Sequence, residues 1–213
     1  MIWLSGKWTP YLAELGFGVM ITPAGHHSLP NWEALDGLPW AADAGTYANS
    51  QWFDLDAYLD WLESLSDHLP TCLFATVPDV FDEGEATAAN HSAMIDIKAR
   101  GYPAAYVLQP GAEATLGGNA WWELADWLFL GGPERWQRGP TAAALLDRFK
   151  RAGKRAHKGR VNSEARVRAA LAAGFDSCDG TFLKFGPDAN RHRVEDWSRL
   201  LKGQLRLPLQ GVL

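Results

Sequence analysis

The sequence has few cysteines, no long apolar segment and no excess of positive charge. Its two cysteines, Cys72 and Cys178, cannot supply a zinc site of the usual kind and indicate buried free thiols rather than a disulfide framework. No segment has the features of a membrane span, a signal peptide or a lipidation motif, so we expect a cytoplasmic protein without a membrane partner. The net charge of −5 argues against a protein that coats nucleic acid through its overall charge.

What the sequence does have is a globular composition. Apolar residues make up 47% and charged residues 21% of 213 residues, which is enough for a substantial core. Eleven tryptophans are many for this length. We expect most of them in the core and some at a cleft rim, where they would stack on sugars or bases. We predict one domain over residues 1–213.

Short apolar runs that end in Gly, Pro or Asp recur along the chain, and helical patterns separate them. Several runs are apolar almost throughout, as expected of parallel strands buried on both faces. Eight strands that alternate with helices predict a closed (β/α)8 barrel of the TIM type, with an open or incomplete barrel as the alternative. The predicted strands are residues 1–6, 18–23, 39–45, 71–79, 104–111, 127–132, 155–161 and 175–180.

Helical spacing of apolar residues predicts four helices between these runs. They span residues 54–66, 84–99, 141–152 and 163–173. Asp54 is a good N-cap for the first helix, and either Asn162 or Ser163 precedes the last. Gly174 suits the residue that follows a helix C-terminus.

One segment, residues 148–160, is strongly basic and contains no acidic residue. A solvated helix end followed by a loop is the ordinary interpretation of such a run. The alternative is a phosphate-binding patch, in which cations gain affinity for nucleic acid by releasing counterions. The residues predicted to hold phosphates are Arg151, Lys154, Arg155, Lys158 and Arg160.

Polar residues interrupt the apolar runs near the ends of the predicted strands, where barrel enzymes place their active sites. Carboxylates in these positions suit either metal binding or acid–base and nucleophilic work at a sugar carbon. His26 and His27 are the histidines that a metal site would use, but adjacent histidines in a loop are more typical of a surface, so we expect no metal. The candidate residues are Asp43, Asp79, Gln109, Gly131, Gly132, Asp176 and Asp179.

The order of these motifs resembles the tRNA-guanine transglycosylases and their phage and bacterial relatives that insert 7-deazaguanines into DNA. The resemblance runs motif by motif from about residue 39 to about residue 186. "DAGTYA" at 43–48 stands where the family has Asp-Ser-Gly-Gly-Phe-Gln, and "GFDSCDG" at 174–180 has the spacing of the family's nucleophile signature. No cysteine follows Asp179, so we expect the family's zinc subdomain to be missing. That departure favours DNA over tRNA as the substrate.

The resemblance implies exchange of guanine for a 7-deazaguanine such as preQ0, without a cofactor. Asp179 would attack C1′ to form a covalent glycosyl-enzyme, and Asp43 would transfer protons to and from the bases. A protein partner or a homodimer would enlarge the surface that binds nucleic acid. The substrate-binding residues implied are Tyr47 stacked on the base, Asp79 or Asp82 with Gln109 on its edge, Gly131 and Gly132 through their backbone, and Asp176 holding the loop or a neighbouring backbone group.

Two other interpretations of the same aspartates stay open. One is a small barrel glycosidase or a metal-dependent hydrolase, for which metal-dependent activity or hydrolysis of a free glycoside would be evidence. The other is a non-catalytic barrel that binds nucleic acid as an accessory subunit. The presence of both Asp43 and Asp179 speaks against the accessory role, because a protein without catalysis need not keep both.

Overall fold

The computed structural model describes residues 1–25, 29–46, 53–115 and 121–204 and contains a closed barrel of eight parallel strands. Each strand pairs with the next one, and the last strand pairs with the first, which closes the barrel. The predicted (β/α)8 barrel is therefore confirmed, and each predicted run contains one strand. The strands are β1 (Ile2–Ser5), β2 (Gly18–Ile21), β3 (Trp40–Ala42), β4 (Cys72–Thr76), β5 (Ala104–Leu108), β6 (Trp127–Leu130), β7 (Arg155–Lys158) and β8 (Ser177–Gly180).

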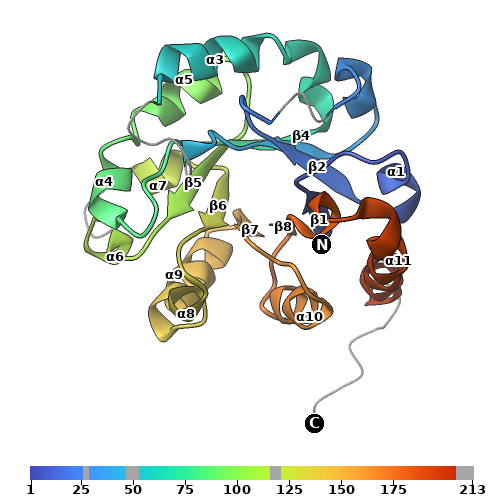
Figure 1. Ribbon diagram of the computed structural model, residues 1–213. Coiled ribbons are helices and arrows are strands. Elements are labelled where there is room, and N and C mark those ends of the chain that lie inside the picture. Colours follow the sequence, from blue (N-terminus) through green and yellow to red (C-terminus); the bar gives the residue numbers. More distant parts are fainter. Residues whose placement is uncertain (26–28, 47–52, 116–120, 205–213) are drawn as a thin grey trace.

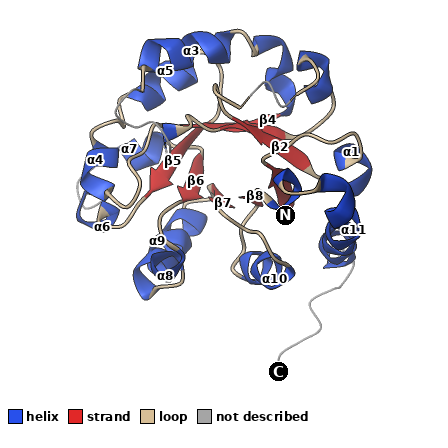
Figure 2. Cartoon of the chain, viewed as in Figure 1, coloured by secondary structure: helices blue, strands red, loops and turns tan. Residues whose placement is uncertain are grey.

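Alternate residues of the strands face the barrel interior and the surrounding helices. Leu4, Phe74 and Trp127 belong to a small buried cluster inside the barrel. Trp3 points the other way, where its ring packs at 5.4 Å from those of Phe17 and Trp197. The strands occupy the middle of the molecule and the helices surround them (Figure 1; Figure 2). This arrangement explains why most strands are apolar on both faces.

The predicted helix over residues 54–66 begins where expected but ends earlier. It is α3 (Leu55–Glu63), and the Asp54 carboxylate accepts a hydrogen bond from the Ala57 amide at 3.2 Å. The prediction of one helix over residues 84–99 is wrong, because the structure has α4 (Gly84–Ala88) and α5 (Ala93–Ala99) with a turn between them. Asn90 in that turn donates its side-chain amide to the Pro78 carbonyl, which ties the turn to the segment after β4.

The other two predicted helices are confirmed. They are α9 (Pro140–Arg151) and α10 (Glu164–Ala172), and Ser163 caps α10 by accepting a hydrogen bond from the Arg166 amide. Gly174 has a φ of 80°, as its predicted place after the helix requires. The other α-helices of the described residues are α1 (Leu12–Leu15), α6 (Ala112–Thr115), α7 (Trp121–Leu124), α8 (Glu134–Gln137) and α11 (Pro187–Gln204), and three short 3-10 helices are η2 (Trp32–Leu35), η4 (Ser66–Thr71) and η5 (Phe182–Lys184).

Both cysteines are free thiols, as predicted, and burial raises the pKa of each. Within the described part of the chain, no helix is both long and apolar enough to cross a membrane.

Candidate functional site

A cavity of about 470 Å³ opens at the end of the barrel where the strands have their carboxyl ends. Most of its walls come from residues at or just after the ends of β3 to β8, which is where barrel active sites form, and α8 and α10 add Gln137 and Arg166. The sequence predictions converge there, since the cavity brings together Asp43, Asp79, Gln109, Gly131, Gly132 and Asp179.

Asp43 follows β3 and is the carboxyl group whose acidity the fold changes most. Its Oδ1 accepts a hydrogen bond from the Gly45 amide at 2.8 Å. Burial, reinforced by the charge of Asp79 and then that of Asp179, raises the pKa of Asp43 to about 7. Near neutral pH this group is therefore present in both protonation states, as a general acid or base requires.

Asp79 is held by two hydrogen bonds, one to each carboxylate oxygen. Thr46 donates its hydroxyl to Oδ1 at 2.6 Å, and Gln109 donates its amide to Oδ2 at 2.5 Å. The Gln109 oxygen in turn accepts from the backbone amide of Asp82 at 3.0 Å. Asp79 lines the cavity and Asp82 does not, although Asp82 supports the network through its backbone.

Gly131 and Gly132 end β6 beside this network. A Cβ atom at Gly131 would lie only 2.7 Å from the Gln109 side-chain nitrogen, and one at Gly132 would lie 2.9 Å from Pro110. Gly132 also has a φ of 77°. A larger residue at either position would therefore push Gln109 and its loop out of place.

Asp179 on β8 is oriented by two groups from the β7 side of the cavity. Its Oδ1 lies 3.1 Å from Nε2 of His157 and accepts from the Arg160 amide at 3.2 Å. Nδ1 of His157 lies 2.8 Å from the Ser177 hydroxyl. A neutral imidazole that donates from Nε2 and accepts the Ser177 hydroxyl at Nδ1 satisfies all of these groups. The carboxylate of Asp179 is thus held at one point of the cavity.

Sequence reasoning missed His157 and Arg166. His157 is fully buried on β7, with its ring 4.5 Å from that of Phe129 and 5.0 Å from that of Phe74. Alternation along the strand was the available signal, because His157 and Gly159 share the face that looks into the barrel. Arg166 reaches the cavity from α10, which no local pattern indicates.

Asp176 does not lie with Asp179, contrary to the prediction. It precedes β8 at the amino end of the barrel, where its Oδ2 accepts from Lys150 Nζ and from the Ala156 amide, both at 2.7 Å. Asp176 does hold a neighbouring backbone group, but that group is across the barrel from the cavity. A substrate-binding role for Asp176 in this cavity is therefore wrong.

The basic run does not form one patch either. Arg151 on α9 pairs with Asp147, and Arg155 begins β7 at the amino end, while Lys158 and Arg160 lie at the carboxyl end. A strand advances about 3.3 Å per residue, so β7 carries the chain from one end of the barrel to the other. The prediction of a continuous phosphate-binding run is wrong for that reason.

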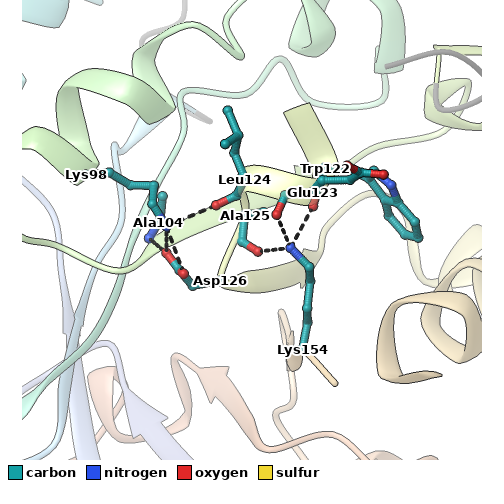
Figure 3. A network of polar contacts seen from close by, with 8 residues as sticks. All are labelled: Lys98, Ala104, Trp122, Glu123, Leu124, Ala125, Asp126 and Lys154. Carbon is teal, nitrogen blue, oxygen red and sulfur yellow. Dashed lines mark hydrogen bonds and ion pairs between the residues drawn. The ribbon is translucent and has the colours of Figure 1, made fainter. Parts of the chain in front are cut away.

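Lys154 has a structural role at the amino end (Figure 3). Its ammonium donates to the carbonyls of Trp122 at 3.1 Å, of Glu123, and of Ala125 at 2.5 Å. Burial lowers the pKa of Lys154. These hydrogen bonds fix the segment that joins α7 to β6. Because the ammonium group is used in them, Lys154 is not available to bind phosphate.

Three of the predicted residues lie outside the described part of the chain, namely Tyr47, His26 and His27. Among the residues that the structure describes, no group of three or more His, Cys, Asp or Glu side chains has the arrangement of a metal site.

Comparison with solved structures finds barrels of the same fold. A protein described as native KDPGal aligns with a TM-score of 0.56 and 15% identity over 97% of this chain and 95% of its own. A mutant tryptophan synthase alpha-subunit from Pyrococcus furiosus aligns with a TM-score of 0.57 and 14% identity over 95% of this chain and 96% of its own. A 4-hydroxy-2-oxoglutarate aldolase from TTHB1 aligns with a TM-score of 0.55 and 17% identity over 96% of this chain and 92% of its own. No protein-family model and no curated protein matches the sequence.

These comparisons contradict the resemblance to the tRNA-guanine transglycosylases, and with it the predicted exchange of guanine in DNA. The matched barrels include one described as a 4-hydroxy-2-oxoglutarate aldolase and several tryptophan synthase alpha-subunits. The motifs were misleading for a physical reason. Polar residues and glycines at strand ends belong to many barrels of different chemistry, because that edge of the fold forms the site. At 14–17% identity the likeness establishes the fold alone.

Proposed function

We propose that the protein is a lyase-type enzyme that breaks a bond of a small polar substrate by proton transfer. The observation that carries the proposal is the buried Asp43, with its pKa raised to about 7, in the same cavity as the firmly held Asp179. Two carboxyl groups in different environments are suited to opposite roles in acid–base catalysis.

In the proposed reaction Asp179 acts as the base and Asp43 as the acid. The Asp179 carboxylate removes a proton from the substrate, and the electrons of that bond move to break the neighbouring one. The protonated Asp43 then gives its proton to the departing fragment. One proton has moved between the two fragments, and exchange with water restores both carboxyl groups for the next cycle.

The positive side chains of the cavity favour a substrate with negative charge. Arg160 and Arg166 line the same cavity as Asp79 and Asp179. A cation placed in the site stabilises an enolate or another anion that develops as the bond breaks. The same charges would hold a carboxylate of the substrate before the reaction.

Proton transfer is also the mechanism that the cavity's residue types favour. Among the described residues that line the cavity there is no lysine, so no amine is placed to form an imine with a carbonyl substrate. The lyase class is supported by the matched barrels, among them a 4-hydroxy-2-oxoglutarate aldolase. The substrate class in that aldolase's name, the 4-hydroxy-2-oxo acids, is the first set of compounds to assay.

The test is a turnover assay on 4-hydroxy-2-oxo acids, with and without a phosphate group, in which release of the 2-oxo acid product is followed. Proton NMR in D2O would record exchange at the carbon beside the carbonyl in parallel. We expect Asp43→Asn and Asp179→Asn to lower kcat by about 100-fold or more. Asp147→Asn is the matched control, because Asp147 lies on α9 and outside the cavity.

Two outcomes would contradict the proposal. One is a folded wild-type protein that catalyses neither cleavage nor exchange with any of these compounds. The other is cleavage that survives in Asp179→Asn at the wild-type rate, since the base would then be a different group.

A further inference from the structure

A second cavity, of about 560 Å³, adjoins the first one on its β7 side. Its walls come from α8, from the end of β7 and from the first turns of α10. Gln137, Arg160 and Arg166 line both cavities, so the two spaces share a wall. A molecule that reacts beside Asp179 could extend past these residues into the second space.

Positive charge dominates the second cavity. Arg138, Lys158, Arg160 and Arg166 line it, and Glu134 is its one acidic residue in the described part of the chain. Glu134 forms ion pairs with both Arg138 and Arg166, so its single charge is divided between two guanidinium groups. The described lining of the cavity therefore contains more cationic than anionic side chains.

Lys158 shows this excess most clearly. Its ammonium group is half-buried, and within the described residues it has no carboxylate partner and no hydrogen bond; it lies 5.6 Å from the ring of Phe175. Burial, and then the charge of Arg138, lower the pKa of Lys158, and Glu134 compensates only in part. An anion in the cavity would relieve the repulsion between these cations.

The helix α10 contributes a further favourable field. Its nine residues begin at Glu164, directly after Ser163, which lines the cavity together with Ala165. The amide groups of a first helical turn and the helix dipole both favour negative charge at this end. This field acts in the same direction as the lysine and arginine side chains that line the cavity.

Arg160 connects the second cavity to the reacting carboxylate. Its amide donates to Asp179, and its carbonyl accepts from Arg166 at 3.1 Å. Arg160 has a φ of 64°, the left-handed conformation that few residues other than glycine adopt, so the backbone is turned to reach both groups. An anion bound to Arg166 would therefore be placed at a fixed distance from Asp179.

We propose that the second cavity is a phosphate subsite, and that the substrate is a small phosphorylated molecule whose reacting end occupies the first cavity. A phosphate monoester carries close to two negative charges and several acceptor oxygens, which matches cations that approach from α8, β7 and α10. The cations line one cavity of about 560 Å³ rather than a stripe along the surface, which fits a small molecule better than a polynucleotide. The identity of the reacting end rests on the proposed lyase function; the binding of phosphate does not.

The experiment is isothermal titration calorimetry with inorganic phosphate, and separately with glycerol phosphate, at constant ionic strength. We expect Lys158→Met and Arg138→Gln each to raise the Kd about tenfold, because each removes a charged donor. Glu134→Gln should lower the Kd, since it removes the competing carboxylate. Arg151→Gln is the matched control, because Arg151 is a cation of α9 that lies outside this cavity.

The outcomes separate this proposal from the lyase function. Asp43→Asn should bind phosphate with the wild-type Kd whether or not the wild-type protein cleaves any substrate. No measurable phosphate binding, or equal binding by wild type and Lys158→Met, would overturn the subsite. Binding of a single-stranded oligonucleotide that depends on Lys158, without binding of either small probe, would overturn it in favour of a polynucleotide surface. Circular dichroism establishes that each variant is folded, and the exposed Arg138 provides a variant that leaves the core intact.

Discussion

Nε2 of His157 lies 3.1 Å from Oδ1 of Asp179, and the two side chains project from neighbouring strands into the same end of the barrel. His157 is fully buried between aromatic rings, and its other nitrogen faces the Ser177 hydroxyl. The imidazole cannot rotate without losing both partners. It is therefore a positioning residue, which holds the proposed base through one hydrogen bond.

We predict that His157→Leu lowers kcat by about tenfold or more with little change in KM, because loss of one orienting hydrogen bond misplaces the base without altering the substrate's binding groups. His157→Gln keeps an amide donor and should restore part of the loss. Steady-state kinetics on the substrate that the turnover assay identifies would provide both values. Equal kcat in wild type and His157→Leu would remove His157 from the mechanism.

Asp43 makes stability depend on pH in a definite direction. Its pKa is raised to about 7 in the folded protein, from an ordinary value of 3.8, so the folded state retains a proton that the unfolded chain releases. The stability associated with that proton is complete below pH 4 and is lost as the pH rises through 7. We predict that Asp43→Asn raises the free energy of unfolding at pH 8 by about 1–3 kcal/mol and changes it little at pH 4.

Urea denaturation of wild type and Asp43→Asn at the two pH values measures this effect. Asp147→Asn serves as the control, since Asp147 is an exposed partner of Arg151. A variant that is less stable than wild type at pH 8 would show that the Asp43 carboxyl is not destabilised by burial in the folded protein.

His91 should make the protein sensitive to acid. It is 1% exposed between α4 and α5, its ring lies 4.2 Å from that of Tyr106, and neither ring nitrogen has a hydrogen-bond partner within the described residues. Burial lowers the pKa of His91 from 6.5 to about 4. The stability that depends on neutral His91 is present above pH 6.5 and is lost as the pH falls through 4.

We predict that wild type loses about 2 kcal/mol more stability than His91→Leu between pH 7 and pH 4.5, because leucine has no proton to gain. Guanidinium denaturation at the two pH values gives the difference. Parallel pH dependence in the two proteins would mean that His91 is readily protonated in the folded state.

Lys154 should affect stability without affecting catalysis. Its ammonium donates to three backbone carbonyls at the amino end of the barrel, across the molecule from the cavity. We predict that Lys154→Met lowers the free energy of unfolding by about 1–2 kcal/mol, because the carbonyls lose a charged donor, and leaves kcat unchanged. Arg151→Gln, which breaks an exposed ion pair, should cost about 0.5 kcal/mol or less. A fall in kcat for Lys154→Met would contradict the separation of the two barrel ends.

How far the sequence predicts the site depends on the range of the interactions involved. The positions of Asp43, Asp79, Gln109 and Asp179 follow from local signals, because a polar residue that ends an apolar strand must lie at the edge where the strands of a parallel barrel end. The same reasoning misplaced Asp176, because β8 spans only Ser177–Gly180 and Asp176 precedes it, at the amino end of the barrel. Strand boundaries are the feature that local patterns define least well.

The sequence by itself determined that this chain forms an eight-stranded barrel and which strand ends carry carboxylates, because both follow from periodicity and from residues adjacent along the chain. Only the tertiary structure decided that His157 orients Asp179, that the basic run divides between the two barrel ends, and that Asp43 holds its proton near pH 7. Each of these depends on closure of the barrel, which brings residues of distant segments into contact and removes water from around them.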